Sequence, residues 1–124
     1  MNCFAKFLAS RLTSIGHAIA GIRYALRSQA NVRVHLVATV IVILLGLGVG
    51  IGRNEWISIV VVIGLVWMAE LFNTALEYLC DLVAPEHSNT VKRAKDLAAG
   101  AVLATAISAA IVGALVFWPH FFSH

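Results

Sequence analysis

The sequence predicts an all-α integral membrane protein, in which an N-terminal amphipathic surface helix precedes a helical bundle of three transmembrane helices. Of the 124 residues, 60% are hydrophobic and 12% are charged, and the mean hydropathy is +0.90. An ordinary soluble domain has about 45–50% apolar and about 25% charged residues. Three apolar stretches also approach the length of about 20 residues that crosses a bilayer.

The predicted transmembrane helices lie at 34–51, 56–80 and 97–118. The first contains one His and one Thr among apolar residues, and the third contains no ionisable residue. Trp56 and Trp118 stand at the ends of two spans, where tryptophan marks a membrane interface. The length of 124 residues allows a single domain, 1–124.

Residues 1–33 have helical periodicity, but they are not apolar enough to cross a membrane. Their apolar residues recur at spacings of three and four, which places them on one helix face. These residues are Phe4, Phe7, Leu8, Leu12, Ile15, Ala18, Ile19, Ile22 and Leu26. Arg11, His17, Arg23 and Arg27 interrupt every apolar stretch, which disfavours a cleaved signal peptide. We therefore expect an amphipathic helix that lies in the cytoplasmic interface of the membrane.

The distribution of lysine and arginine predicts the orientation. Eight of the nine cations precede the first span or separate the second span from the third, and such cations favour the cytoplasmic side. The N-terminus and the 81–96 loop are therefore expected in the cytoplasm, with the 52–55 turn and the C-terminus outside. The cations are scattered among apolar runs and form no contiguous basic face, which argues against a nucleic-acid partner.

Four polar residues form a stripe on the second span: Glu70, Asn73, Glu77 and Asp81. At about 100° per residue they fall within an arc of about 80°. With a rise of about 1.5 Å per residue, Glu70 lies about 21 Å and Asp81 about 37 Å along the helix from Trp56. This polar stripe therefore runs from inside the inner leaflet to the cytoplasmic surface. Ionisable residues within a span face protein or water rather than lipid, so the stripe is a candidate site.

A second charged group begins the third span. Lys92, Lys95 and Asp96 occupy relative positions 0, 3 and 4, and we expect this face to meet the Glu77 end of the polar stripe. Carboxylates there could hold a hard cation while the lysines bind the phosphates of a nucleotide. The alternative is that the acids only pair with cations and hold the bundle together.

Other local features are interpreted structurally. The alternating glycines at 46–52 lack the Lys-Ser/Thr pair of a phosphate-binding loop, so they predict packing and a helix end. Pro85 is expected to end a helix, and one of residues 88–90 to cap the next. Cys3 and Cys80 have the spacing of neither a metal site nor a disulfide framework.

Two segments make the sequence resemble a known family. Residues 70–77 read ELFNTALE and are followed by Asp81, and residues 94–103 read AKDLAAGAVL. The pattern E-x-x-N-[TS]-A-x-E with A-K-D downstream closely resembles the prokaryotic diacylglycerol kinase and undecaprenol kinase family of small integral-membrane lipid kinases. The likeness covers roughly 14–118.

The resemblance implies a homotrimer of three-span subunits in the bacterial cytoplasmic (inner) membrane, each with an N-terminal surface helix. The active sites would be composite, built between neighbouring subunits on the cytoplasmic side. The activity would be the transfer of the γ-phosphoryl group of ATP to the hydroxyl of a membrane lipid alcohol, undecaprenol or diacylglycerol, with Mg²⁺ as the cofactor.

The resemblance also implies roles by position. Glu70 would be the catalytic base. The substrate-binding residues would be Glu70, Asn73, Arg33 and Asn31. The ATP-binding residues would be His17, Gln29, Glu77, Glu86, His87, Lys95 and Asp96. Glu77 and Gln29 would be the metal ligands, and the family usually has Glu where Gln29 stands. The pattern of Asn31, Arg33 and His35 is more similar to the undecaprenol-kinase branch.

Two other functions are compatible with an intramembrane polar stripe. A small oligomeric membrane transporter or proton-conducting helical bundle also uses intramembrane carboxylates. The sequence has no ionisable residue between Glu55 and Glu70, so such a pathway would end at Glu70. A catalytically silent scaffold would use the acids only to bind neighbouring subunits.

Overall fold

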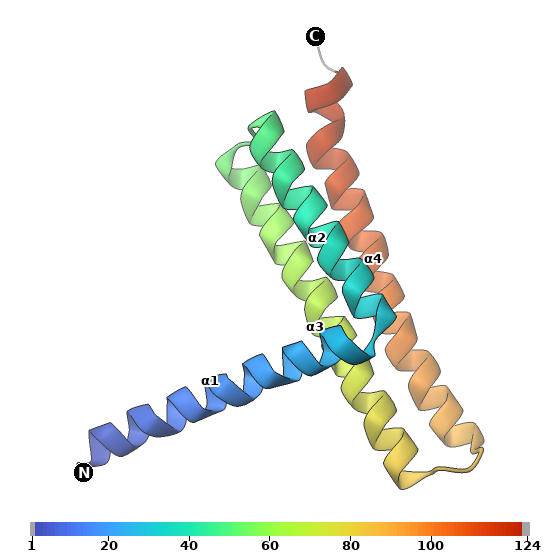
Figure 1. Cartoon of the computed structure of the whole chain (residues 1–124). Helices are drawn as coiled ribbons and strands as arrows, with labels where there is room; N and C mark the ends of the chain where they lie inside the picture. The colour runs from blue at the N-terminus through green and yellow to red at the C-terminus, as the bar shows by residue number, and fades with distance from the viewer. Residues whose placement is uncertain (1, 123–124) are drawn as a thin grey trace.

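The protein, seen here in a computed structural model that describes residues 2–122, builds its regular structure from helices alone in that range. In chain order the helices are α1 (Cys3–Ser28), α2 (Ala30–Val49), α3 (Arg53–Val83) and α4 (Asn89–Phe122) (Figure 1). The helices α2, α3 and α4 are long and apolar enough to cross a membrane. The predictions of an all-α fold and of three candidate membrane spans are confirmed, and this is the architecture of a multi-pass membrane protein.

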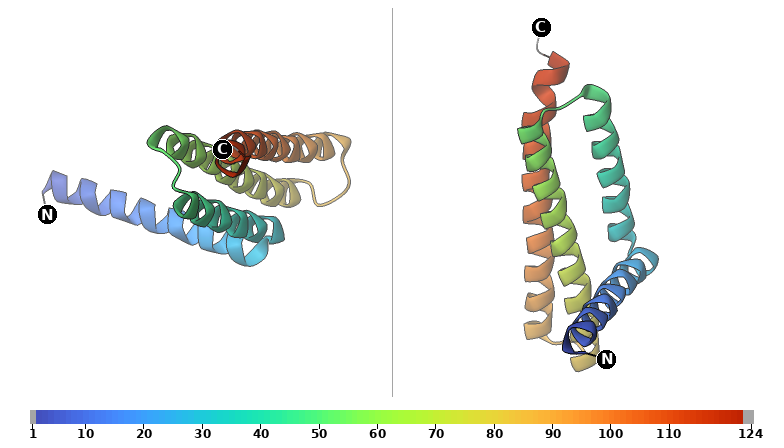
Figure 2. Two further views of the ribbon diagram at one scale, coloured as in Figure 1. Left: turned by 90° about the horizontal axis from the view of Figure 1, so that it is seen from above. Right: turned by 90° about the vertical axis from the view of Figure 1, so that its left-hand side faces the viewer.

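Helix α3 connects the parts of the bundle. It packs most extensively against the antiparallel α4 and less extensively against α2. Helix α1 leaves the bundle near the middle of α3 and projects sideways, so that its N-terminus lies away from the other helices (Figures 1 and 2). The loop between α3 and α4 lies at one end of the bundle, and the turn between α2 and α3 lies at the other end with the last turns of α4 (Figure 1).

A break at Gln29 divides the predicted surface region 1–33 between two helices. Gln29 has an extended backbone, with φ of −118° and ψ of 117°, and its N–H donates to the Ala25 carbonyl to close α1. The next helix, α2, begins at Ala30 rather than at residue 34. The first span therefore includes residues that the sequence assigned to the surface helix.

Arg33 stabilises this corner. Its guanidinium donates to the carbonyl oxygens of Leu26 and Arg27, each at 3.0 Å. The last carbonyls of an α-helix have no partner within the helix, so Arg33 supplies donors that α1 lacks. One side chain of α2 thus terminates α1 and sets where the chain turns.

The alternating glycines pack and turn the chain, as predicted. Gly50 ends α2 in the left-handed conformation, with φ of 78°, which glycine adopts without steric strain. The Glu55 carboxylate accepts a hydrogen bond from the Gly52 N–H at 3.1 Å and caps the start of α3. Gly46 is buried against the ring of Trp56.

The loop 84–88 reverses the chain between α3 and α4. Helix α3 ends at Val83, two residues before Pro85. The Ser88 hydroxyl accepts a hydrogen bond from the Val91 N–H at 3.5 Å at the start of α4. The expected cap within 88–90 is therefore provided by Ser88.

The packed core of one subunit is small. Ile51, Ile59, Val116 and Phe117 form its buried cluster, toward the end of the bundle that carries the turn between α2 and α3. Most other large apolar side chains of the three spans are exposed in the single subunit. Soluble monomers rarely expose such continuous apolar surface, so these faces contact lipid or other protein.

We predict that Gly46→Ala destabilises the subunit. The added methyl carbon would lie 2.8 Å from Cη2 of Trp56, so the ring would have to leave its packed position, and overpacking of this kind costs about 1–3 kcal/mol. The measurement is the free energy of unfolding in detergent micelles. The matched control is Gly48→Ala, where the methyl meets nothing within 4 Å and helix propensity favours alanine by about 1 kcal/mol. Equal effects of the two substitutions would contradict the packing role of Gly46.

Candidate functional site

Glu70 is buried where α2 meets α3. Its side chain is 3% exposed, and its Oε1 lies 2.8 Å from Nε2 of His35 on α2. Burying a charged group is costly unless the group is paired and hydrogen-bonded, and the imidazole provides this partner. The deep end of the polar stripe therefore faces protein rather than lipid.

His35 is a site residue that the sequence analysis used only as part of a family pattern. It is the one ionisable residue within the predicted first span, 34–51. An ionisable residue inside a span is a functional candidate by default, so this signal alone could have identified it. That its partner is Glu70 becomes visible only in the fold.

Asn73 follows Glu70 by one turn of α3 and lies on the side that packs against α4. Its Oδ1 is buried, and no donor among residues 2–122 reaches it. The groove of about 380 Å³ beside it is formed by α3 and α4 and is otherwise apolar. A buried acceptor without a donor costs about 1–3 kcal/mol. The position therefore favours a donor from outside the subunit.

The other end of the polar stripe pairs with α4. Nζ of Lys95 lies 2.6 Å from Oδ1 of Asp81, and Nζ of Lys92 lies 2.7 Å from Oδ2 of Asp96 on the same helix. We expected the cations of α4 to meet the stripe at Glu77. Instead Lys95 pairs with Asp81, one turn nearer the loop, because the loop between the two antiparallel helices sets their register.

The Asp81 carboxylate also determines the charge of Lys95, which precedes the apolar segment 97–118. The hydrogen bond between the two side chains raises the pKa of Lys95, and the negative charge of Glu77 adds a smaller effect in the same direction. The ammonium group therefore stays protonated at neutral pH. It carries the positive charge that a phosphate group requires.

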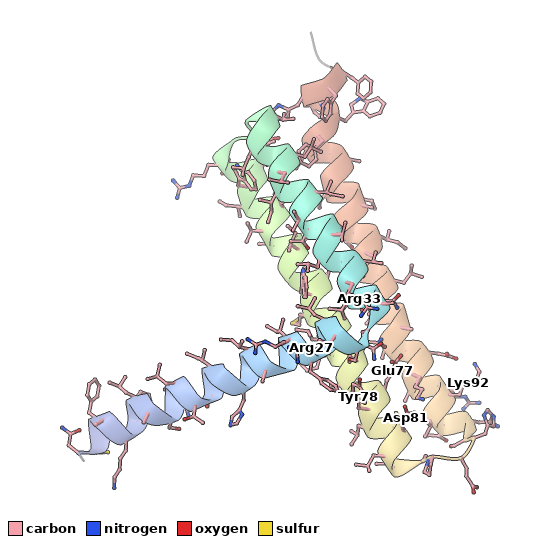
Figure 3. All side chains as sticks on the ribbon, viewed as in Figure 1. Arg27, Arg33, Glu77, Tyr78, Asp81 and Lys92 are labelled. Carbon is pink, nitrogen blue, oxygen red and sulfur yellow. The ribbon has the colours of Figure 1, made fainter. Side chains whose placement is uncertain are left out.

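Glu77 lies on α3 between the two paired ends of the stripe. It is half-buried, and its carboxylate has no hydrogen-bond or ion-pair partner among residues 2–122. Figure 3 shows Glu77 with Asp81 and Lys92 toward the loop end of the bundle, below the corner that carries Arg33. Its oxygens are therefore available to a cation.

A polar groove of about 420 Å³ is formed by the end of α3, the loop and the start of α4. Its charged and polar lining is Asp81, Glu86, His87, Ser88, Lys92, Lys95 and Asp96. Four of the predicted ATP-binding residues, Glu86, His87, Lys95 and Asp96, thus share one surface. Ammonium and carboxylate groups side by side can bind phosphates and hydroxyls.

A pair of tyrosines joins α1 to α3. The ring centroids of Tyr24 and Tyr78 are 5.6 Å apart, and the Tyr78 hydroxyl donates to Oγ of Ser28 at 3.1 Å. The side chains of Gln29 and Glu77 both neighbour Tyr78. Gln29 therefore lies close to Tyr78 where α1, α2 and α3 meet, and Glu77 precedes Tyr78 on α3. The sequence analysis did not identify this aromatic pair.

The remaining predicted residues do not reach these groups within one subunit. His17 and Asn31 are exposed. His17 lies midway along α1, which projects from the bundle (Figure 2). The guanidinium of Arg33 is bound to the carbonyls at the end of α1. One subunit thus presents parts of a site rather than the full predicted set.

Comparison with known proteins covers the same segments. The family described as prokaryotic diacylglycerol kinase matches residues 16–117. This chain belongs to that family. It is 39% identical over 106 residues to undecaprenol kinase of Bacillus subtilis, with 86% of each chain covered. It is 39% identical over 109 residues to diacylglycerol kinase of Synechocystis, with 87% of this chain and 62% of the relative covered. It is 26% identical over 110 residues to diacylglycerol kinase of Escherichia coli, with 89% and 90% covered.

The match to the diacylglycerol kinase family contains every predicted site residue. These residues run from His17 to Asp96, inside the matched segment 16–117. The matched segment also contains the contact between His35 and Glu70. The buried acid, the unpaired acid and the charged groove therefore belong to the part of the chain that is shared with this family.

The oxygen donors near Tyr78 fit a magnesium ion that is bound together with phosphates. No three His, Cys, Asp or Glu side chains converge on one point within residues 2–122. Magnesium does not need such a cage, because it is usually held by one or two carboxylates with waters and substrate phosphates. Glu77 offers an unpaired carboxylate and Gln29 a neutral carbonyl oxygen. The chemistry of these two donors is compatible with such an ion.

Proposed function

We propose that the protein is an ATP-dependent lipid kinase that transfers the γ-phosphoryl group of ATP to the hydroxyl of a membrane lipid alcohol. The observation that carries the proposal is the polar stripe, which connects the buried carboxylate of Glu70 to the charged groove that begins at Asp81. Membership in a kinase family and the kinase names of the relatives support it. Those names give no support to a transporter or a proton-conducting bundle.

The candidate substrates are undecaprenol and diacylglycerol, the lipids in the names of the relatives. Undecaprenol is the stronger candidate, because the Bacillus subtilis relative is 39% identical, whereas the Escherichia coli diacylglycerol kinase, which is covered to a similar extent, is 26% identical. The pattern of Asn31, Arg33 and His35 favours the same lipid. A panel of the two alcohols measures the preference directly.

Glu70 is the base for the lipid hydroxyl in this proposal. Its carboxylate takes the proton of the hydroxyl while the lipid oxygen forms a bond to the γ-phosphorus. The bond between the γ-phosphorus and the bridging oxygen breaks, and its electron pair leaves with ADP. Glu70 and Glu77 are about 10.5 Å apart along the helix axis, which leaves room for the hydroxyl and the γ-phosphate. Asn73, one turn further along α3, would orient the lipid headgroup through its side-chain amide.

The nucleotide occupies the polar groove between α3 and α4. Phosphoryl transfer depends mainly on alignment and on neutralisation of phosphate charge, and Lys95 supplies a fixed positive charge there with Asp96 beside it. Glu86 and His87 in the loop would contact the base and ribose. When bound, magnesium neutralises further phosphate charge, and Glu77 with Gln29 would hold it.

A complete site requires more than one subunit, and we infer a homotrimer with active sites between neighbouring subunits. His17, Asn31 and Arg33 do not reach the polar groove of their own subunit. The buried oxygen of Asn73 has no donor among residues 2–122, and the spans expose large apolar faces. A neighbouring copy can satisfy all three. The number three rests on the family resemblance.

The same proposal places the polar groove on the cytoplasmic side of the bacterial inner membrane. Eight of the nine Lys and Arg residues belong to α1, the start of α2 or the start of α4, and such cations favour the cytoplasmic side. Helix α1 would lie along this surface, with its apolar stripe in the membrane and its cations among the lipid headgroups. ATP would then reach the groove from the cytoplasm.

We predict that the active protein in mild detergent contains three copies of the 13.3 kDa chain. The site residues that are separated within one subunit call for a neighbouring subunit, and the exposed apolar faces offer it a surface. Native mass spectrometry measures the copy number, and the same sample is assayed for phosphorylation. An active monomer would contradict the composite site, and an active dimer would contradict the number three.

We predict that Glu70→Gln lowers the rate of lipid phosphorylation by at least about 10²-fold, the usual contribution of a general base. The assay uses ATP, Mg²⁺ and either undecaprenol or diacylglycerol, and nucleotide binding is expected to persist. The matched control is Glu55→Gln, because Glu55 is a carboxylate at the opposite end of the same helix, where it caps Gly52. This control is expected to remain active. Full activity of Glu70→Gln would exclude Glu70 as the base.

We predict that Gln29→Glu lowers the Mg²⁺ concentration required for half-maximal activity by about tenfold, because ligand charge tunes the affinity for a hard cation. Gln29→Leu, which removes the oxygen donor, is expected to raise it. The measurement is a magnesium titration at fixed ATP. The same titration curve for all three proteins would contradict a ligand role for residue 29.

A further inference from the structure

We propose that His35 is a positioning residue for the phosphoryl-transfer reaction, which fixes the orientation of the Glu70 carboxylate and directs one of its oxygens toward the lipid hydroxyl. The inference rests on the proposed role of Glu70 as the base and adds a residue that this role did not include. The two side chains come from different helices, α2 and α3, and meet at 2.8 Å.

The contact occupies only one oxygen of Glu70. Nε2 of His35 lies against Oε1. An ionised carboxylate can only accept hydrogen bonds, so His35 donates through its Nε2–H. The second oxygen, Oε2, then remains for the proton of the lipid hydroxyl. Because the Glu70 side chain is 3% exposed, bulk water cannot replace the imidazole as the donor.

No other charged group competes for His35 among the described residues. It lines an apolar groove of about 350 Å³ formed by α2, α3 and α4. From α4, the segment 97–118 contains no ionisable residue. At the α1 corner, the guanidinium of Arg33 is bound to backbone carbonyls. From α3, the titratable group that faces His35 is Glu70.

The contact is not needed to align α2 with α3. One turn further along α2, Oγ1 of Thr39 accepts a hydrogen bond from Nε1 of Trp67 at 2.9 Å. This bond links the same two helices within about one turn of His35 and Glu70. Two contacts therefore align α2 with α3. Among residues 2–122, however, only His35 donates to the Glu70 carboxylate.

A positioning role and a purely structural role of His35 predict different effects of pH on kcat. Burial disfavours the charged form of a carboxylate, and a hydrogen bond to that form favours it. Loss of the donor should therefore change how the reaction rate depends on pH, because only an ionised carboxylate can accept the hydroxyl proton. A purely structural loss lowers the amount of folded enzyme and leaves the pH profile in place.

The test compares three variants of the full chain, purified in detergent with ATP, Mg²⁺ and undecaprenol or diacylglycerol. His35→Leu removes the donor. His35→Gln keeps an N–H near the position of Nε2. Thr39→Val removes the other link between α2 and α3 and serves as the structural control. The measurements are kcat, KM for ATP, the pH profile of kcat and the unfolding temperature.

We expect His35→Leu to lower kcat by about 10- to 100-fold with KM for ATP unchanged. The acidic limb of its kcat profile should also shift, which a loss of folded enzyme alone does not cause. His35→Gln should recover most of kcat and the position of that limb. Thr39→Val should lower the unfolding temperature and keep the pH profile.

An unchanged kcat and pH profile in His35→Leu would overturn the inference. Equal losses of kcat in His35→Leu and Thr39→Val, with the pH profile of kcat unchanged in both, would also overturn it. If His35→Leu does not fold, His35→Gln decides: a retained acidic limb and kcat support the inference, and a shifted limb with a low kcat overturns it. Glu70→Gln separates the two proposals. Full activity of that variant removes the base itself, whereas an inactive Glu70→Gln beside an unaffected His35→Leu overturns the role of His35 alone.

Discussion

The structure depends on one constraint: a carboxylate inside an apolar helix must be faced by protein. Leaving Glu70 toward lipid would expose a polar group to a medium that offers no hydrogen bond. Helix α3 therefore turns its polar stripe toward its neighbours. His35 on α2 meets Glu70, and Lys95 on α4 meets Asp81. These two contacts join α3 to α2 and to α4, and the hydrogen bond from Trp67 to Thr39 also joins α2 to α3.

The burial of the polar stripe decreases from Glu70 to Asp81. Its acids are therefore suited to different proposed roles. Glu70 is buried and held by one donor, Glu77 is half-buried and unpaired among residues 2–122, and Asp81 lines the open groove beside Lys95. A buried acid suits proton transfer with a lipid hydroxyl, and an accessible acid suits a hydrated cation. A helix that passes from membrane to water provides both environments with four residues on one face.

A single chain leaves several groups without the partners that they require. The buried core is small, large apolar faces of the spans are exposed, and Oδ1 of Asn73 is buried without a donor in the described range. Helix α1 projects away from its own bundle (Figures 1 and 2). Under the proposed homotrimer, a neighbouring copy and the bilayer together would satisfy each of these features.

The sequence by itself determined the helical class, the approximate spans and the single face that carries Glu70 and Asp81, because hydrophobic period and residue spacing along one helix are local properties. It also identified the family. Only the tertiary structure decided that His35 is the partner of Glu70 and that Lys95 meets Asp81 rather than Glu77. These pairings depend on the register between helices, which is set by loop geometry and by packing across residues far apart in the chain.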